Sequence, residues 1–526
     1  MTLPTLSAGD FLPLIPALIL SVAAVILLLS EVFLSPNASR GYQSMLTGVA
    51  ALGAGGVALL SMSESPHSVF LGFGVLDPFS SFITLVVCVT LALAALLSSG
   101  FLRQRQAERG EFYALMCFAS AGMSLLALSA ELITLFINLE VMSIATYALT
   151  AYLRRGTRPS EAGFKYFILG AFSTALLLYG TSLLYGVTGT TMLSKMAGPL
   201  GAALQDHGRS AALAYCGITL IGAGFAFKVA AIPFHMWTPD VYEGAPTPVT
   251  ALMSAGVKAA AFAALVRVFL TLSAHGDNRM ALGAFSALAF VTMLGGNLMA
   301  LPQRNVKRML AYSSIAHAGY LLVGVAALFA NPQQATPGLH LFTGTAPGLP
   351  GLAMEAVRSE ALRGILFYLL AYAVTVVGAF GTLGALERRE DEERGKGWDL
   401  ERFSGLVHRR PGWAVAMAVF MLSLGGIPPT VGFMGKLFIF RAGVDAGLVG
   451  LVVMGVLSSA VGVYYYLRVV VHMFMRPAAE GQLAPERHAS TDFALCVSTV
   501  AVMLFGIAPH WVSGWITQAS SLLLSP

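Results

Sequence analysis

Long apolar runs, separated by short polar segments, make up most of this chain. A helix needs about 20 predominantly apolar residues to span the hydrocarbon core of a bilayer. By that measure the pattern predicts an all-α polytopic membrane protein with about fourteen spanning helices. The predicted spans lie near residues 11–31, 43–62, 77–100, 112–129, 131–152, 161–187, 210–238, 247–273, 279–301, 307–330, 357–385, 411–440, 447–475 and 493–516. A membrane β-barrel is excluded, because barrel strands are short segments of alternating hydrophobicity.

The composition agrees with a membrane protein. Of the 526 residues, 56% are hydrophobic and 11% are charged, whereas about 25% of the residues of an ordinary soluble domain are charged. A cytosolic enzyme, a nucleic-acid-binding protein and a disordered chain are therefore excluded. The net charge of +5 is mild, and the four cysteines are scattered without a CxxC motif. The sequence thus predicts no iron–sulfur or zinc site.

Two polar stretches interrupt the apolar pattern, but no second domain is predicted. Residues 386–410 are dense in charges of both signs and are predicted to form a solvated loop. Residues 331–356 are rich in glycine and proline and are predicted to form an irregular loop.

Lysine and arginine are concentrated in alternate loops, which follow the first, third, fifth, ninth, eleventh and thirteenth predicted spans. The positive-inside rule places these loops on the cytoplasmic side. With an even number of spans, both termini are expected on the outer side. Because the first basic residue is Arg40, the first apolar run is expected to be retained rather than cleaved as a signal peptide. Near span ends, Lys165, Arg267 and Arg468 are expected to extend to the membrane interface.

Three lysines, Lys228, Lys258 and Lys436, lie well inside apolar runs. A charged residue at the bilayer centre costs about 2.5–3.5 kcal/mol on insertion scales. Removal from water disfavours the charged form of an amine, so such a lysine can exchange a proton near neutral pH. A single lysine of this kind could also serve packing or a subunit interface. Three of them favour a proton relay.

One acid and two histidines also lie at membrane depth, namely Glu140, His235 and His317. His235 follows Lys228 by seven residues and is expected on the same helical face. Structural interpretations remain open for each. Glu140 could be only the charge partner of one lysine, His235 could satisfy carbonyls freed by Pro233, and His317 could be a core residue bonded to polar neighbours within one turn.

Two predicted spans contain helix-breaking residues. One includes Pro233 in FAFKVAAIPFHMWTPD, and the other includes the GGIPP motif at 425–429 in MLSLGGIPPTVGFMGK. Proline removes a backbone donor, and such breaks persist in a membrane only where they are buried or line a water cavity. Each break lies near a buried lysine, and paired interruptions in two halves are typical of inverted-repeat transporters. The alternative is a pair of ordinary proline kinks.

The chain resembles a known family most closely in four segments. These are FKYFILGAFSTALLLYG (164–180), GFAFKVAAIPFHMWTPDVYEGAPTPVTALMSAGVK (224–258), NVKRMLAYSSIAHAGYLLVG (305–324) and GGIPPTVGFMGK (425–436). They closely resemble the subunit N family of bacterial NADH–quinone oxidoreductase, respiratory complex I, and the likeness covers nearly the whole chain. That family is one of three antiporter-like families in the membrane arm of the complex.

The resemblance implies a single transmembrane domain, residues 1–526, with two inverted five-helix repeats and two broken helices. Its expected parts are an N-terminal three-helix segment at 1–111, a first repeat with helices 4–8 at 112–273, a second repeat with helices 9–13 at 279–475, and a C-terminal helix at 493–516.

The resemblance also implies which residues carry protons. The expected relay consists of Glu140, Lys228, Lys258, Lys436, His235 and His317. Glu140 and Lys228 would form a switching ion pair. Lys258 would be the central lysine, and Lys436 would be the terminal lysine. Loss of the acid's charge would then release the proton of its partner toward the other lysines, past the two histidines.

The expected function is proton transport across the inner membrane of a bacterial cell, driven by NADH-to-quinone electron transfer in other subunits. NADH, FMN, iron–sulfur clusters and quinone would be held by those partners, and this chain would hold no cofactor or metal. The expected partners are the other membrane-arm subunits, the lipid bilayer and protons, with no nucleic acid. Two alternatives are an Mrp-type secondary cation/proton antiporter and a structural subunit needed only for assembly.

Overall fold

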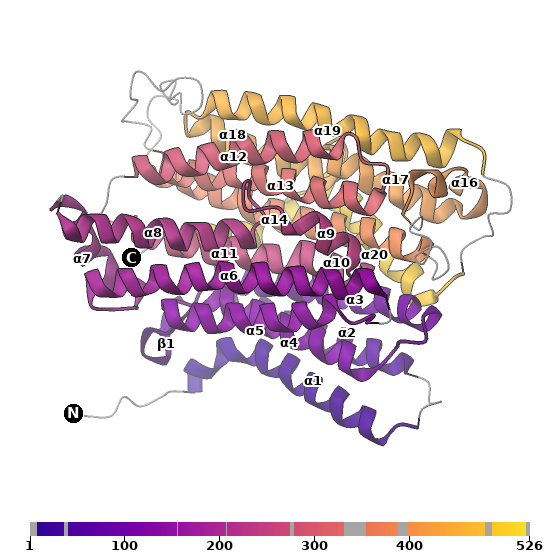
Figure 1. The fold of residues 1–526 in the computed structure, drawn as a ribbon, viewed down its shortest axis with the longest axis horizontal. Helices are drawn as coiled ribbons and strands as arrows, with labels where there is room; N and C mark the ends of the chain where they lie inside the picture. The colour runs from indigo at the N-terminus through magenta and orange to yellow at the C-terminus, as the bar shows by residue number, and fades with distance from the viewer. Residues whose placement is uncertain are drawn as a thin grey trace.

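The computed structural model describes residues 8–35, 40–154, 156–206, 208–273, 278–330, 354–387, 398–478 and 486–521. Within these residues, thirteen helices are long and apolar enough to cross a membrane. Most of them run side by side, from α1 at one edge of the bundle to α19 at the opposite edge (Figure 1). The all-helical membrane architecture predicted from the apolar runs is therefore confirmed.

The spanning helices follow one another along the chain. The first six are α1 (Ile15–Phe33), which follows the 3-10 helix η1 (Ala8–Leu14), then α2 (Gly41–Ser61), α3 (Pro78–Gln104), α4 (Gly110–Leu128), α5 (Leu132–Thr150) and α6 (Thr157–Thr188). The next four are α8 (Arg209–Lys228), the continuous α10 (Thr247–Leu252), η3 (Met253–Val257) and α11 (Lys258–Leu272), then α12 (Arg279–Ala300) and α13 (Val306–Phe329). The last three are α14 (Met354–Leu386), α19 (Val449–Met475) and α20 (Ala489–Ile507).

Two of the predicted spans are divided, as their prolines and glycines indicated. The chain leaves α8 at Lys228 and resumes in the short helix α9 (Trp237–Gly244). The span predicted at 411–440 consists of α17 (Pro411–Gly425) and α18 (Val431–Asp445). Together with this divided pair, the thirteen helices account for all the predicted spans. The five-helix repeats remain a prediction, in which a divided helix takes the fourth place of each repeat.

Several elements were not predicted. A hairpin of β1 (His67–Val69) and β2 (Gly74–Leu76) follows α2 and includes the 3-10 turn η2 (Phe70–Gly72). The helix α7 (Leu193–Gln205) lies between α6 and α8. The predicted helix at 493–516 is wrong as one element, because α20 ends at Ile507 and α21 (His510–Ser521) begins a new helix. Pro509 explains the stop, since it cannot donate a helical hydrogen bond and restricts the residue before it.

The loop predictions are only partly testable. Residues 331–353 and 388–397 lie outside the described residues. The described part of the charged stretch is not simply solvated, because Trp398 and Leu406 are buried within η4 (Leu400–Phe403), α16 (Leu406–Arg409) and their approach. At its start, Glu387 is 1% exposed and pairs with Arg105 at 2.9 Å. That stretch therefore packs against the bundle at both described ends.

Two basic residues differ from the expectation that they reach the interface. Arg267 is 7% exposed and pairs with Asp77, the N-cap residue of α3, at 2.9 Å. Arg468 is partly buried, and it donates to the carbonyls of Leu301 and Gln303 beyond the end of α12. Both residues thus bind helix ends, because a helix terminus leaves backbone groups without partners inside the helix.

Three elements form the interior of the bundle. The most apolar windows of the α10–η3–α11 segment and of α14 are wholly buried, and that of α13 is nearly so. Helices that are apolar on all sides are the ones that a protein can enclose completely. These three elements carry Lys258, His317 and three tyrosines that contact them, Tyr320, Tyr368 and Tyr372.

Candidate functional site

Each of the three lysines singled out in the sequence is buried, and each lies at an irregularity of its helix. Lys228 is the last residue of α8 before the first break. Lys258 begins α11 directly after the π-helical turn η3. Lys436 lies in α18, shortly after the second break. Their exposed fractions are 3%, 2% and 6%.

Lys228 is held by hydroxyl groups of α5. Its Nζ donates to Ser143 Oγ at 2.9 Å and to Tyr147 OH at 3.4 Å. The direct Glu140–Lys228 ion pair that the family resemblance implied is not formed in this structure. One carboxylate oxygen of Glu140 is buried and has no hydrogen-bond partner among the described residues. Glu140 therefore lies on the same helix as the groups that bind Lys228, but its carboxylate does not bind the ammonium.

His235 does not lie on the helical face of Lys228, and that part of the prediction is wrong. The seven-residue spacing assumed one continuous helix, but α8 ends at Lys228 and residues 229–236 form the break before α9. His235 Nδ1 is buried without a hydrogen-bond partner among the described residues. Its own carbonyl accepts the N–H of Thr238, which helps to start α9.

Lys258 binds α13 within one turn of His317, which lies on that helix. Lys258 Nζ donates to both the carbonyl and the hydroxyl oxygen of Ser314, each at 2.5 Å. His317 bonds two tyrosines from other helices, Tyr368 of α14 at 2.6 Å and Tyr466 of α19 at 3.1 Å. His317 is thus a satisfied interior residue, as one of the two open interpretations held, but tyrosines rather than its own neighbours are its partners.

Lys436 binds across its own helix break. Its Nζ donates to the carbonyls of Leu424 at 2.9 Å and Gly425 at 3.0 Å, which close α17. The third bond goes to Ser459 Oγ of α19 at 2.7 Å. Because an ammonium has three donors, these contacts satisfy it completely.

Aromatic rings connect Lys258, His317 and Lys436 into one interior cluster. The Lys258 ammonium lies 5.3 Å from the ring centroid of Tyr372, whose ring lies 5.0 Å from that of His317. On the other side, the ring of Tyr320 lies 5.6 Å from His317 and 5.1 Å from the Lys436 ammonium. From the Lys228 site a second row of rings begins: the Lys228 ammonium lies 5.8 Å from the ring centroid of Tyr147, and Tyr147, Tyr166, Trp237 and Tyr242 contact one another in turn.

A small cavity opens beside His317. It is lined by side chains of α13, α14, α17 and α18, which include His317, Tyr368, Tyr372, Thr375 and Ser423. The Tyr372 hydroxyl is buried without a hydrogen-bond partner among the described residues. A small cavity lined by hydroxyl groups, one of them unpaired, is a candidate place for a buried water. The interior cluster therefore has titratable groups and a small cavity beside His317.

The two breaks differ in how their backbone groups are satisfied. At the first break, the Phe227 carbonyl accepts the Trp237 indole N–H at 3.1 Å and the Ala230 N–H at 3.0 Å. At the second, Gly426 adopts a left-handed conformation with φ of 79° and closes α17. There, the last carbonyls are satisfied by Lys436 itself. At the second break, backbone N–H groups bind the carbonyls of Leu422 and Ser423, and a charged side chain binds the two carbonyls that follow.

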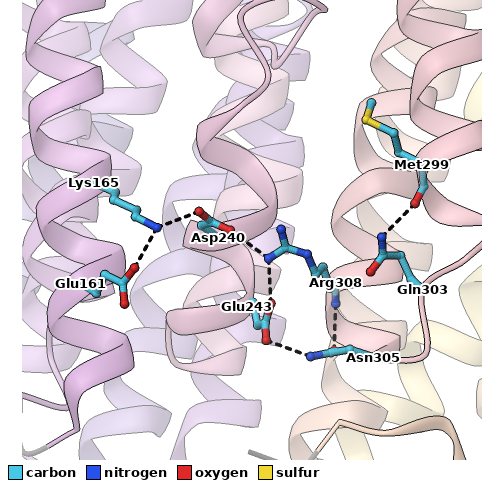
Figure 2. A network of polar contacts seen from close by, with 8 residues as sticks. All are labelled: Glu161, Lys165, Asp240, Glu243, Met299, Gln303, Asn305 and Arg308. Atoms are coloured by element: carbon cyan, nitrogen blue, oxygen red, sulfur yellow. Dashed lines mark hydrogen bonds and ion pairs between the residues drawn. The ribbon is translucent and has the colours of Figure 1, made fainter.

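A separate polar network ties α9 to its neighbours on the side of the basic loops (Figure 2). Asp240 of α9 binds Lys165 of α6 and Arg308 of α13, both at 2.8 Å. Arg308 also binds Glu243 at 2.9 Å, and Lys165 binds Glu161 at 2.7 Å. Lys165 is 40% exposed, in agreement with its predicted place near an interface. The network fixes the end of the first divided helix to helices on both sides.

Sequence reasoning missed the hydroxyl groups that bind the lysines and the histidine. These partners are Ser143, Tyr147, Ser314, Tyr368, Ser459 and Tyr466. One signal was available, because a serine three residues from Glu140 shares its helical face. The others come from helices distant in sequence. No group of three His, Cys, Asp or Glu side chains within the described residues comes together as a metal site.

Comparisons with known proteins show the family and fold of the chain. Residues 129–342 and 349–462 match the family described as NADH:quinone oxidoreductase/Mrp antiporter, TM. The chain is 68% identical to NADH-quinone oxidoreductase subunit N of Myxococcus xanthus, over 99% of each chain. The match to a chain of respiratory complex I from Thermus thermophilus has a TM-score of 0.74 and 32% identity, over 95% of this chain and 98% of that chain.

A second solved structure shares the fold. A chain of the Mrp complex from Dietzia matches with a TM-score of 0.81 and 22% identity, over 99% of this chain and 98% of that chain. The fold and the buried lysines thus define an antiporter-like membrane protein. Within that class, the chain belongs to the NADH-quinone oxidoreductase subunit N family.

Proposed function

We propose that this chain is a proton-translocating subunit in the membrane arm of a bacterial NADH-quinone oxidoreductase. The single observation that carries the proposal is the burial of three lysines without any ion-pair partner among the described residues. A buried amine without a carboxylate partner can release its proton much more easily than an exposed one. Such residues inside a membrane protein are typical of proton pathways.

The proposed relay begins at Glu140 and Lys228. Glu140 stabilises the charged form of Lys228 through the local field rather than by a direct bond, with Ser143 and Tyr147 as the bonded partners. When the acid is neutralised or drawn away, the ammonium becomes less stable and its proton is released toward Lys258. His235 lies in the break beside this route, and we propose that it contacts the water along it.

The second part of the relay runs through the interior cluster. The proton passes from Lys258 along α13 to His317 and on to Lys436, with the cavity beside His317 as the place for an intervening water. The rings of Tyr147, Tyr166, Trp237 and Tyr242 contact one another in turn from the Lys228 site. Water beside this row of rings is the proposed link between the two parts of the relay.

The energy for transport would come from NADH-to-quinone electron transfer in partner subunits, which would hold NADH, FMN, the iron–sulfur clusters and quinone. Coupling to this chain would be conformational and electrostatic. It requires an element with two conformations whose equilibrium depends on both the electron-transfer site of the partners and the proton relay of this chain. The two divided helices are the proposed elements. The other membrane-arm subunits and the bilayer are the proposed partners, and both termini are proposed to lie on the outer side of the inner membrane.

The test is Lys228→Ala in the complete complex, reconstituted in vesicles. Proton pumping and NADH–quinone reductase activity should fall together by about tenfold or more, since a positioned proton carrier contributes at least that much. Lys228→Arg should fail similarly, because arginine stays charged. Lys165→Ala is the matched control, since Lys165 is 40% exposed in an ion-pair network. Normal pumping by assembled Lys228→Ala complex would contradict the proposal and favour a role in assembly only.

A second candidate function is secondary cation/proton antiport. The fold of the Dietzia Mrp chain, which matches with a TM-score of 0.81, supports keeping it. The distinguishing measurement is exchange of Na⁺ or K⁺ for protons in vesicles without NADH. Exchange that depends on Lys228, together with no NADH–quinone reductase activity in particles purified through this chain, would favour the antiporter.

A further inference from the structure

The three buried lysines share one kind of partner, a serine hydroxyl from a neighbouring helix. The pairs are Lys228 with Ser143 at 2.9 Å, Lys258 with Ser314 at 2.5 Å, and Lys436 with Ser459 at 2.7 Å. The serines come from α5, α13 and α19, so the pattern does not arise from one local motif. None of the ion pairs formed by the described residues includes any of these lysines.

A hydroxyl differs from a carbonyl or a carboxylate because it can bind both protonation states of an amine. An ammonium offers three donors, whereas a neutral amine offers two donors and one lone pair that needs a donor. A backbone carbonyl can only accept, and an ionised carboxylate can only accept. A hydroxyl accepts from the ammonium and can turn to donate to the neutral amine.

Lys436 illustrates the requirement. Two of its three partners are the carbonyls of Leu424 and Gly425, which can keep two N–H groups in either state. The third partner, Ser459 Oγ, is the one member of this set with a proton to donate. Without it, the neutral amine would have a buried lone pair with no donor among these three partners.

We propose that Ser143, Ser314 and Ser459 are positioning residues that allow the buried lysines to lose and regain a proton without losing a hydrogen bond. In the charged state each hydroxyl accepts from Nζ. The hydroxyl proton of Ser143 then goes to the Leu139 carbonyl, at 2.6 Å. When a proton leaves Nζ for the next carrier, the hydroxyl turns and donates to the amine, and no proton leaves the serine. This inference rests on the proposed function.

Ser459 offers the sharpest test, because it is partly exposed and its removal leaves little strain. The titratable groups that face the Lys436 ammonium and its break are His317 and Tyr320 of α13, Tyr368 and Tyr372 of α14, and Tyr466 of α19. A Ser459 variant leaves these five side chains in place, although Ser459 also interacts with Tyr320. A shift in pH dependence that persists in a Tyr320→Phe background is assigned to Lys436.

The experiment compares Ser459→Ala, Ser459→Thr and Ser458→Ala in the complete complex in vesicles, with NADH-driven proton pumping measured across a range of pH. Bonds to a charged donor are about twice as strong as neutral ones, so alanine should disfavour the ammonium more than the amine. The pH profile of Ser459→Ala should move toward acid by about half to one unit, with a several-fold lower maximum rate. Ser459→Thr should restore both, because threonine keeps the hydroxyl.

Ser458→Ala is the matched control, since the neighbouring Ser458 binds Asn297 and a backbone carbonyl rather than a lysine. It should leave the pH profile in place. An unshifted profile for Ser459→Ala would overturn the proposal, as would an equal shift in Ser458→Ala. If the Ser459→Ala complex fails to assemble, the pH profile of proton pumping is compared instead between Ser143→Ala and its control on α5, Thr150→Val. Lys436→Ala is measured in parallel: normal pumping by that variant would overturn the proposed function itself.

Discussion

The break between α8 and α9 and the break between α17 and α18 both have a buried lysine beside them, but the two lysines bind different partners. Lys228 lies before its break and binds hydroxyls of another helix, α5. Lys436 lies after its break and reaches back to the carbonyls that end α17. At the first break, the indole of Trp237 takes over the corresponding task for the Phe227 carbonyl.

At the first break, the charge on the lysine does not affect the hydrogen bonds that hold the backbone. At the second break, the lysine itself makes some of those hydrogen bonds. If Lys228 loses its proton, the backbone of its break keeps its own donors. If Lys436 loses its proton, one of its three bonds must change from donation to acceptance. The second break is therefore the place where a protonation event can act directly on the connection between two half-helices.

The largest effect is expected from a glycine at the second break. A Cβ on Gly432 would lie 2.0 Å from the backbone oxygen of Ser423, so the start of α18 would have to move. Gly432→Ala should destabilise the subunit by about 3 kcal/mol or more, at the upper end of overpacking effects. The measurement is the amount of this subunit in purified complex and the temperature at which it aggregates in detergent.

Gly222→Ala before the first break is the matched control. Its Cβ would meet nothing nearer than a Phe269 ring carbon at 3.4 Å, and alanine favours a helix over glycine by about 1 kcal/mol. A wild-type level of complex with Gly432→Ala would show that the tight packing of the second break is not required.

A smaller effect should distinguish the two lysines by stability. Lys436→Ala leaves the Leu424 carbonyl without its ammonium donor and the Gly425 carbonyl with only the long bond from Ser459 Oγ, at 3.5 Å. An unpaired buried group costs about 1–3 kcal/mol. Lys228→Ala leaves the backbone of its break intact, while Ser143 still donates to the Leu139 carbonyl. The aggregation temperature should therefore fall more for Lys436→Ala than for Lys228→Ala. Lys436→Arg retains donors and should recover part of the lost aggregation temperature. If both alanine variants lower that temperature equally, the two breaks do not differ in this way.

The smallest effect concerns the ion pairs around α9. Asp240 bridges Lys165 and Arg308 across two helix contacts, whereas the ion pair of α18 within the described residues, Arg441 with Asp445, is internal to that helix. Asp240→Asn should lower stability by about 0.2–1 kcal/mol, because these side chains are partly exposed.

Salt supplies the check on this last prediction. The loss caused by Asp240→Asn should shrink as ionic strength rises, because exposed charges are screened. Glu161→Gln is the control, since Glu161 binds Lys165 within α6 only. A loss of the same size in Asp240→Asn and Glu161→Gln would mean that the network does not connect α9 to its neighbours.

Local features of the sequence were enough to predict the helices and the two breaks. Apolar runs of spanning length specify a membrane helix because the bilayer requires every backbone group to be bonded within its own segment. Proline and glycine mark interruptions because their backbone chemistry acts locally. The buried lysines could be found for the same reason, since their cost depends on depth in a run rather than on any distant partner.

The failed predictions have different causes. The same-face placement of His235 assumed that α8 continued, but the chain leaves the helix at Lys228. The burial of Trp398 in a charged stretch depends on the bundle against which it packs. The hairpin after α2 is too short to show a strand pattern.

The sequence by itself determined a bundle of about fourteen spans, two of them interrupted, and the identity of the ionisable residues inside it. Only the tertiary structure decided what those residues bind. It joined Lys258, His317 and Lys436 through tyrosines of α13, α14 and α19, and it gave Lys228 a serine in place of a carboxylate. The reason is physical: apolar length and helix breaking are properties of one segment, whereas a hydrogen bond requires two segments to meet.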